Sequence, residues 1–488
     1  MTAPSPPRAT HPPRPGRVAV LGAGIAGITA ADALAKEGIP AVLLEAEAKI
    51  GGLCRTESVH GYLCDIGGHR FFTKIPEVQQ LWLELMGPDM LVRERLSRIY
   101  YRGLFFDYPL RAGNALRNLG LRESARCVAS YARARLRPRG DEQSFEAWVS
   151  NRFGDRLFDI FFRTYTEKVW GVPTHEISAD WAAQRIRDME LATVLRRALL
   201  GLAGRGRQVG PDAERSLVER FHYPSHGPGM LCERQLARAC AGGASLHTGH
   251  RVVRLEHDGR RVLQAVAATA DGERSFEADA FLSSIPIHQL VQAMHPAPPS
   301  AVLEAAQSLR YRSFLVVFLA LDRPDLFPDN WIYVHEPGTS LGRIQNFGNW
   351  SPHMVPKPGH SALGLEYFCT QGDELWSMED SELIALGQRE LEATGLSRGA
   401  RVLHGAVFRA PMAYPLYTTG YQHQVTVLRD WLGRLENLQP MGRYGMFKYN
   451  NADHSVLTAL LAVRNLLGGE HDVWAVNTDE DYLESDES

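Results

Sequence analysis

Three glycines with the spacing G-x-G-x-x-G, Gly22, Gly24 and Gly27, are followed by an acidic residue, Glu45, about 20 residues later. In this arrangement the first glycine permits a tight turn and the second lets the backbone approach a pyrophosphate. The third lets a helix pack closely on a strand. A carboxylate at the position of Glu45 can accept hydrogen bonds from ribose hydroxyls. These residues therefore predict the binding of a dinucleotide.

The elements that must position these residues are visible in the surrounding sequence. The apolar run 18–21 predicts a buried strand, the alanine-rich segment 26–36 a helix, and 41–44 a second strand. The N-terminal amides of that helix would point at the phosphates, which places Ala26 in the cofactor site. Because strand, helix and acid all accompany the glycines, a dinucleotide site is favoured over a glycine-rich turn of some other α/β unit.

Two glycine pairs, Gly51-Gly52 and Gly67-Gly68, follow the second strand and are accompanied by Arg55 and His69. Paired glycines permit close backbone approach and positive φ, and many flavoproteins use them with a cation near the FAD pyrophosphate. The simpler interpretation is two hairpin turns. A nicotinamide-binding fold continues with repeated βα units, and this chain does not, so the sequence favours FAD over NAD.

The bulk properties narrow the class of protein. A chain of 488 residues is long enough for two or three domains. A net charge of −3 gives no general reason to expect nucleic acid or a membrane as partner. No apolar run approaches the ~20 residues of a membrane span. The six cysteines lack CxxC or metal-ligand spacing, so we expect reduced thiols, no metal site and a cytoplasmic protein.

The pattern along the chain predicts an α/β fold. It combines an FAD-binding Rossmann-like domain with an inserted helical domain and an antiparallel β-sheet substrate domain. The FAD-binding domain is discontinuous, because strand and helix signals of the α/β type return after an insertion. A strand predicted at 251–255 places Val253 in the cofactor site. The predicted parts are a disordered tail at 1–16, an FAD-binding domain at 17–74, 221–290 and 436–470, a helical domain at 75–220, a sheet domain at 291–435 and an acidic tail at 471–488.

Further elements are predicted from periodicity. We expect helices at 75–96, 111–139, 144–171 and 181–200, a strand pair at 99–110, a mobile loop at 204–216 and β-type segments over 309–414. The arginines of 111–139 could contact an anionic surface or a polyphosphate, but a solvated helix face is favoured. Over 441–469 a glycine-rich loop opens a long apolar helix. Its first amides, at Asp453, His454 and Ser455, would point at the flavin.

Eight segments resemble the flavin-dependent UDP-galactopyranose mutases, with motifs closer to the eukaryotic type, and their bacterial relatives described as FAD-dependent oxidoreductases. These segments read VLGAGIAGITAA, YLCDIGGHRFFT, YYRGLFFDYPL, TYTEKVWGVPTHEISADWAAQRI, FHYPSHGPGM, NWIYVHEPGTSLGRIQNFGNWS, AYPLY and GRYGMFKYNNADHS. The resemblance implies that His69 lies in a loop beside the flavin and that Arg185 and Arg343 bind the substrate diphosphate. It further implies that the substrate contacts Tyr108, Trp170, Tyr333, Tyr414, Arg443, Tyr449 and Asn451.

The residue types agree with these implied roles. Arginine supplies planar, permanently charged donors for phosphate oxygens, and tyrosines add hydroxyl donors and apolar walls. Two positions depart from the eukaryotic pattern in the uridine pocket, where Arg111 and Thr166 stand in place of glutamine and asparagine. The diphosphate site is therefore better supported than the identity of the base or of the sugar.

The resemblance implies a redox-neutral reaction, the interconversion of pyranose and furanose forms of a nucleoside-diphosphate sugar. In it, N5 of reduced FAD attacks the anomeric carbon and expels the nucleoside diphosphate, and NAD(P)H is the expected external reductant. The alternatives are an oxidoreductase like the amine oxidases and protoporphyrinogen oxidases, or a non-catalytic FAD-binding protein of a glycan pathway. A homo-oligomer is compatible with every one of these functions.

Overall fold

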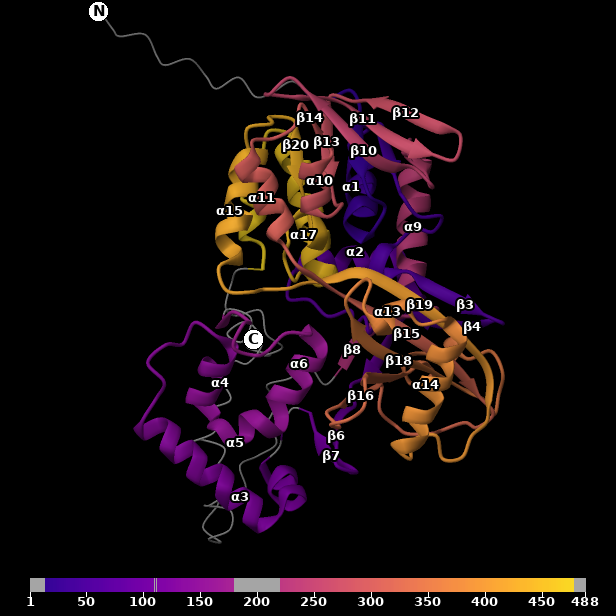
Figure 1. The fold of residues 1–488 in the computed structure, drawn as a ribbon. Helices are drawn as coiled ribbons and strands as arrows, with labels where there is room; N and C mark the ends of the chain where they lie inside the picture. Colours follow the sequence, from indigo (N-terminus) through magenta and orange to yellow (C-terminus); the bar gives the residue numbers. More distant parts are fainter. Residues whose placement is uncertain (1–13, 109, 111, 180–219, 478–488) are drawn as a thin grey trace, which may run out of the picture. The chain divides into compact units, whose positions relative to one another are not determined.

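The computed structural model describes residues 14–108, 110, 112–179 and 220–477 (Figure 1). The chain forms two compact units. Unit 1 comprises Met1–Gly52, Cys232–Ser308 and Gln424–Thr478. Unit 2 comprises Leu53–Leu231, Leu309–His423 and Asp479–Ser488. The three-domain division and its boundaries given above stay a prediction, and most of both predicted tails lies outside the described residues.

A five-stranded parallel sheet forms the centre of unit 1, with the strand order β20-β13-β1-β2-β9. The strands are β1 (Val18–Leu21), β2 (Ala41–Leu44), β9 (Ser245–His247), β13 (Ala280–Ser283) and β20 (Leu438–Pro440). Every residue of β1, β2 and β13 is buried, as expected for a parallel sheet covered on both faces. The predicted strands at 18–21 and 41–44 are confirmed.

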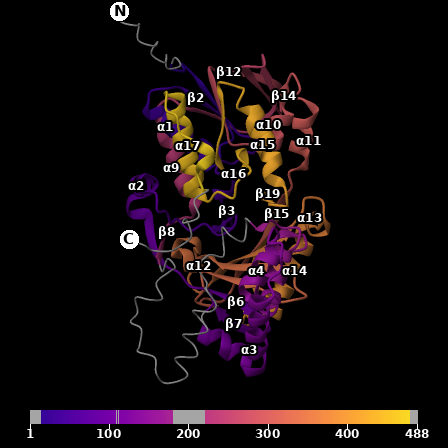
Figure 2. The same ribbon diagram turned by 90° about the vertical axis from the view of Figure 1, so that its left-hand side faces the viewer.

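Helices accompany this sheet. They are α1 (Ile25–Lys36), α9 (Pro228–Ala241), α10 (Ile287–Gln292), α11 (Ser300–Ser308), α15 (Tyr421–Leu432), α16 (Gly442–Gly445) and α17 (Ala452–Leu466), with the short turn η6 (Val473–Ala475). Helix α1 confirms the helix predicted at 26–36. It lies beside α17, the predicted long apolar helix of the C-terminal segment (Figure 2). Small residues on α1 allow this close packing.

A second sheet of unit 1 has the order β12-β11-β10-β14. Its strands are β10 (Arg251–His257), β11 (Val262–Thr269), β12 (Gly272–Glu277) and β14 (Met294–His295). The strand predicted at 251–255 is thus confirmed and extends two residues further. Its pairing with β11 shifts register between Val252 and Arg254, so Val253 lies at a bulge.

Unit 2 contains a seven-stranded sheet with the order β19-β15-β18-β17-β16-β6-β7. Its strands are β6 (Ser97–Tyr101), β7 (Leu104–Asp107), β15 (Tyr311–Leu321), β16 (Trp331–Val334), β17 (Leu341–Asn346), β18 (Ser361–Cys369) and β19 (Val402–Pro415). Neighbouring strands in this sheet run antiparallel, except that β16 and β6 run parallel. The predicted fold class, a parallel FAD-binding sheet combined with helices and an antiparallel sheet, is confirmed.

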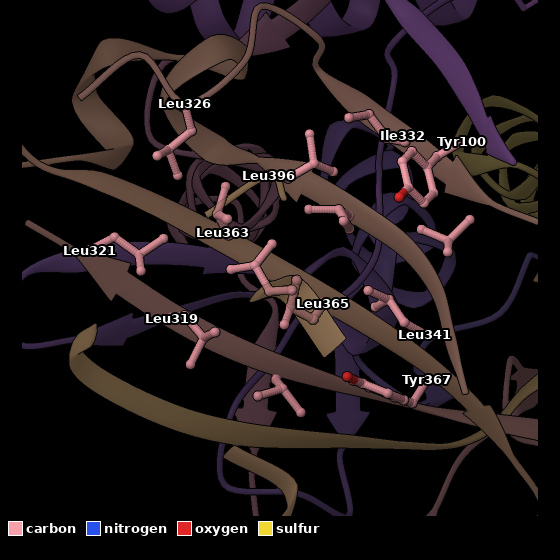
Figure 3. Packing of buried hydrophobic residues seen from close by; sticks show 14 of the residues in the cluster. Tyr100, Leu319, Leu321, Leu326, Ile332, Leu341, Leu363, Leu365, Tyr367 and Leu396 are labelled. Atoms are coloured by element: carbon pink, nitrogen blue, oxygen red, sulfur yellow. The ribbon is translucent and has the colours of Figure 1, made fainter. Parts of the chain in front are cut away.

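The core of unit 2 lies between this sheet and helix α14 (Asp380–Ala393). Leucines of three neighbouring strands, among them Leu319, Leu363 and Leu341, point to the same face and are fully buried (Figure 3). Burial of apolar surface stabilises the folded state by about 25 cal/mol for each Å² removed from water, so such a core is among the main stabilising contributions. It gives β17 and β18 a rigid frame. The short elements α12 (Phe347–Trp350), η5 (Pro352–Met354) and α13 (Glu374–Ser377) complete this part.

The helix predicted at 75–96 is only partly correct. Helix α2 (Pro76–Met86) ends where Gly87 adopts a φ of +52° and a proline follows. After the turn η2 (Gly87–Asp89), the chain forms strand β5 (Met90–Glu94), which pairs with β8 (Arg220–Pro224). The strand pair predicted at 99–110 is confirmed as β6 and β7. A further hairpin joins β3 (Thr56–Val59) to β4 (Tyr62–Asp65), after the turn η1 (Gly52–Cys54).

The helical part of unit 2 contains the predicted helix at 111–139 as α3 (Ala112–Leu136), which is broken at Gly120, where φ is +74°. The block predicted at 144–171 forms α4 (Phe145–Phe153), α5 (Asp155–Leu157), η3 (Phe158–Arg163) and α6 (Thr164–Trp170). Gly154, with a φ of +82°, separates the first two. The helix predicted at 181–200 and the loop at 204–216 lie outside the described residues.

Candidate functional site

The glycine turn after β1 has the geometry that its spacing predicts. Gly22 has a φ of +96°, and a Cβ at Gly27 would lie 1.9 Å from the carbonyl oxygen of Gly22. Gly24 has no other protein atom within 4 Å of the position of a Cβ, so open space lies in front of the turn. Gly51 donates its N–H to the carbonyl of Ala23 at 2.8 Å, which brings the 51–52 glycine pair against this turn.

Glu45 closes the other side of the turn. Its carboxylate accepts hydrogen bonds from the N–H of Ala23 at 2.7 Å and from the N–H of Glu47 at 2.9 Å. These two contacts fix the carboxylate at the C-terminal end of β2, where parallel-sheet proteins place ligands. Ala26 lies in the first turn of α1, close to Gly442, so the C-terminal segment also reaches this edge of the sheet.

The N-terminal end of α17 brings together four of the predicted residues. The Asn451 side chain caps the helix, and the His454 side chain accepts a hydrogen bond from the Asn451 N–H in return. Asp453 and Ser455 are buried in the same turn. Nearby, the Arg443 guanidinium lies 4.1 Å from the centre of the Tyr449 ring and donates to the carbonyl of Asn450. Val253, by contrast, is 39% exposed on β10.

These residues of unit 1 suit a flavin dinucleotide. The open space at Gly24, the positive φ angles of the 51–52 pair and the fixed Glu45 carboxylate form the cradle that a pyrophosphate and a ribose require. The amide end of a capped helix supplies partial positive charge for polar atoms of a flavin ring. The fold and this cradle define a flavin-binding class of protein.

Arg343 is the centre of the charged group in unit 2. It lies on β17 directly opposite Tyr333 of β16 and Glu366 of β18. Its Nε is 2.8 Å from Glu366 Oε2, and its Nη2 donates to the hydroxyl of Tyr414 at 2.8 Å. These two contacts, from the neighbouring strand and from β19, fix the plane of the guanidinium.

Aromatic rings surround this arginine. Phe368 lies under the guanidinium, with 4.8 Å between Cζ and the ring centre. Trp170 makes an edge contact with Tyr414, and Tyr108 packs on Tyr333 at 4.7 Å between ring centres. The structure therefore brings Arg343, Tyr333, Tyr414, Trp170 and Tyr108 into one group. Tyr108 is 40% exposed at its edge.

The second glycine pair reaches the same group. Gly67 has a φ of +85°, and Phe314 lies against it and also against Tyr414. Gly68 lies close to the amide of Gln345, which donates to Glu366 Oε1 at 2.5 Å. The next residue, His69, has its Nδ1 3.0 Å from the Gly67 carbonyl. The predicted loop residue and the predicted arginine are thus connected through the pair of Gln345 and Glu366.

A buried carboxyl group precedes this loop. Asp65, the last residue of β4, accepts hydrogen bonds from the hydroxyls of Tyr223 and Thr56. Burial raises the pKa of Asp65 to about 7, although these two hydroxyls oppose the shift. Arg55, predicted to face the pyrophosphate, lies on the same hairpin and pairs with Glu57 at 2.9 Å.

Sequence reasoning missed several residues that contribute to the group. Tyr165 contacts the Tyr333 ring and stacks on His335 at 4.4 Å, and burial raises its pKa well above the usual value. Lys168 donates to three carbonyls of the β16–β17 region, and burial lowers its pKa to about 8. Glu366 and Gln345 were missed as well. The alternation in LGRIQN placed Gln345 on the side of Arg343, which was a usable signal.

Other predictions fall outside this group. Arg185 and the substituted position Arg111 lie outside the described residues. Thr166, the other substituted position, is buried in α6. The six cysteines, all described, form no disulfide. Over the described ranges no cluster of three metal-ligating side chains occurs, and no helix is long and apolar enough to cross a membrane.

Comparison with known proteins agrees with the class of protein that the fold defines. The chain belongs to the flavin containing amine oxidoreductase family, whose model matches residues 25–424. A structure of reduced UDP-galactopyranose mutase superposes with a TM-score of 0.81 at 22% identity over 96% of both chains. The resemblance to the mutases is therefore confirmed at the level of the fold.

Two further similar proteins are, by their names, a mutase and an oxidase. The dTDP-fucopyranose mutase of Escherichia coli is 27% identical over 175 residues, which are 33% of this chain and 44% of that protein. A putrescine oxidase structure with bound putrescine has a TM-score of 0.59 at 16% identity, over 93% of this chain and 99% of that one. The chain spans about half the length of the curated relatives that it matches first.

Proposed function

We propose that the protein is an FAD-dependent sugar-nucleotide mutase. It would interconvert the pyranose and furanose forms of a nucleoside-diphosphate sugar without net redox change, with FAD in its reduced form and NAD(P)H as the external reductant. The named mutases among the relatives support this function, and so does the charged group of unit 2. Its place in glycan biosynthesis and in the cytoplasm is part of the same proposal.

One observation carries the proposal: in the pair of Arg343 and Glu366 the cation is the accessible partner. The arginine side chain is 21% exposed and the glutamate side chain 1%. The buried carboxylate holds the guanidinium in place, and the guanidinium presents its charge outward. A surface of this kind attracts an anion such as a diphosphate rather than an ammonium group.

The proposed roles follow from these positions. Arg343 binds the diphosphate and stabilises the negative charge that develops as the sugar–phosphate bond breaks. Tyr414 orients the arginine, and Tyr333 and Tyr108 form apolar walls with hydroxyl donors. Reduced flavin supplies the nucleophile when it is bound. His69, with Nδ1–H directed at the Gly67 carbonyl, would present Nε2 as an acceptor beside the reacting sugar.

The remaining predicted residues have proposed roles in the same scheme. In unit 1, Glu45 and the glycines 22, 24, 27, 51 and 52 would hold the adenosine diphosphate part of FAD, and the α17 turn from Asp453 to Ser455 would hold its ring. Arg443, Tyr449 and Asn451 are proposed substrate contacts. Arg185 is the proposed second diphosphate ligand, and Arg55, Gly67, Gly68 and Val253 stay proposed cofactor residues.

Membership in the amine oxidoreductase family favours a second function, a flavin oxidoreductase. An amine oxidase needs an apolar or anionic pocket for a cationic substrate. The burial of Glu366 beneath Arg343 argues against a cation at that point. An oxidoreductase acting on an anionic substrate would retain the arginine and is distinguished by its net electron transfer.

The test uses the yellow FAD-bound protein, reduced with dithionite and kept anaerobic. UDP and TDP hexoses are offered, and pyranose and furanose forms are separated by chromatography. The proposal predicts interconversion with at least one of them and no net consumption of reductant. Steady flavin turnover on another substrate, without interconversion of any nucleotide sugar, would refute the mutase function.

Substitutions address the arginine. Arg343→Met alone leaves Glu366 buried without its partner, so the sharper variant is Arg343→Met with Glu366→Gln, which removes both charges. We expect nucleotide-sugar affinity to fall at least roughly tenfold while FAD stays bound. The matched control is Arg401→Met on an exposed ion pair with Asp322. Equal loss in the control would show that the effect is not specific to Arg343.

A further inference from the structure

Helix α3, labelled in Figure 1, carries a stripe of apolar residues on an exposed face. Beyond the break at Gly120, the exposed positions 121, 125, 128, 132 and 136 recur at intervals of three and four residues, so they share one side of the helix. They hold leucine, alanine, valine, alanine and leucine. Leu121 is 92% exposed, Leu136 83% and Val128 43%. We call these five residues the α3 stripe.

The α3 stripe is not the face by which the helix packs on its own unit. That contact is made on another side, by Ser124 and Cys127, which are buried. Cys127 joins a core cluster with Phe106 of β7, Ile160 of η3 and two residues of β6, Ile99 and Tyr101. The helix is therefore held in place on its inner side, and the stripe is apolar surface that the described part of the chain leaves exposed.

Arginines lie along the α3 stripe. At 100° per residue, Arg122, Arg126, Arg133 and Arg137 fall along one edge and Arg135 along the other. Residues 121–140 hold six arginines and one glutamate. That glutamate, Glu123, pairs with Arg126 and Arg156. Among the described residues no carboxylate forms an ion pair with Arg122, Arg133, Arg135 or Arg137. A solvated face explains the arginines but not the leucines between them.

We propose that the α3 stripe binds the surface of an anionic lipid bilayer, with the helix lying in the plane of the interface. The leucines and the valine would enter the boundary of the acyl chains, and the arginine stems would extend along them to place their charges among lipid phosphates. Arginines near an anionic membrane each add electrostatic attraction. The composition of the stripe, small and apolar with basic edges, is that of an interfacial helix.

Two other occupants fit the charges less well. A second copy of the chain, docked by a two-fold axis through this face, would bring arginine rows against arginine rows. A nucleic acid would use the arginines, but its phosphates would leave Leu121 and Leu136 in water without function. Only a surface that is both anionic and apolar uses both components.

The test is sedimentation of the full-length FAD-bound protein with vesicles. We expect at least roughly tenfold tighter binding to vesicles of phosphatidylcholine with phosphatidylglycerol than to phosphatidylcholine alone, and release by high salt. The variant Leu121→Ser with Leu136→Ser should lose roughly tenfold in affinity, and Arg133→Glu with Arg137→Glu should lose at least as much. Matched controls are Leu263→Ser, an exposed leucine on β11, and Arg260→Glu, an exposed arginine.

Flavin absorbance and thermal melting verify that each variant is folded. The proposal is overturned if the protein ignores anionic vesicles, or if the control variants lose binding as much as the α3 variants. It is equally overturned if the leucine variant converts an oligomer to a monomer in size-exclusion chromatography without changing vesicle binding. Binding to RNA with an affinity insensitive to the leucines, in the absence of vesicle binding, would assign the face to nucleic acid instead.

Discussion

Arg343 and Glu366 lie opposite each other on β17 and β18, with 2.8 Å between Nε and Oε2, and only the arginine reaches the surface. The strand pairing puts the two side chains on one face, and the buried leucines behind the sheet hold both strands in place. The carboxylate is held on its other oxygen by Gln345. The ion pair with the buried Glu366 therefore holds the Arg343 guanidinium in position and leaves the positive charge as the accessible one.

Substitutions of Arg343 and Glu366 should have strongly non-additive effects on the free energy of unfolding. Arg343→Met leaves a buried carboxylate unpaired and should lower the free energy of unfolding by about 2 kcal/mol, a value reduced because the arginine is partly exposed. Adding Glu366→Gln should recover part of that loss. Urea denaturation of the two single variants and the double variant gives the coupling energy. Additive losses would contradict an interaction between the two side chains.

Substitutions at two glycines of the G-x-G-x-x-G turn should affect flavin binding and folding differently. Gly24 has a φ of −74° and open space at Cβ, so Gly24→Ala should fold normally but weaken flavin binding at least roughly tenfold. Gly27→Ala places a Cβ 1.9 Å from the Gly22 carbonyl oxygen and should prevent folding of the turn. Flavin absorbance and apoprotein melting measure both effects. Gly113→Ala on α3, with open space at Cβ, should change neither.

The buried Asp65 makes stability depend on pH. Its pKa is about 7 in the folded protein, because of burial, and about 3.9 when unfolded. Between these values the folded protein binds the proton more tightly, so stability falls as pH rises from about 4 to 7 and the loss is complete above 7. Its contribution should fall by about 2 kcal/mol from pH 5 to pH 8. Urea denaturation should give a smaller pH dependence for Asp65→Asn; an unchanged one would assign it to other groups.

Lys168 should make stability rise with pH in the alkaline range, which is the opposite of the dependence expected from Asp65. Burial lowers its pKa to about 8, so above pH 8 the folded protein releases a proton that the unfolded chain keeps until about pH 10.4. Stability contributed by this group therefore rises over that interval, by about 2 kcal/mol at pH 10. Lys168→Met should remove the rise, and it should be less stable at pH 7 because three carbonyls lose their donor. Chemical denaturation at pH 7 and pH 10 measures both, and a retained rise would contradict the assignment.

Local patterns predicted a large part of the fold. The strand, turn and helix of 18–36, the strand pair at 99–110 and the long C-terminal helix depend on neighbouring residues, so periodicity and glycine spacing suffice to find them. The prediction of a helix at 75–96 was wrong for the residues of β5. These residues form a strand because they pair with β8, more than a hundred residues away. A partner so distant leaves no local signal.

The sequence by itself predicted the dinucleotide turn and the class of cofactor, because these depend on residue types at fixed spacings. The two arginines proposed for the diphosphate followed from the resemblance to the mutases. Only the tertiary structure decided which partners surround Arg343. Glu366, Tyr414 and Tyr165 come from two other strands and a helix, and sheet register and packing bring them beside Arg343. Burial, which sets the pKa values and determines which charge is accessible, exists only after those segments assemble.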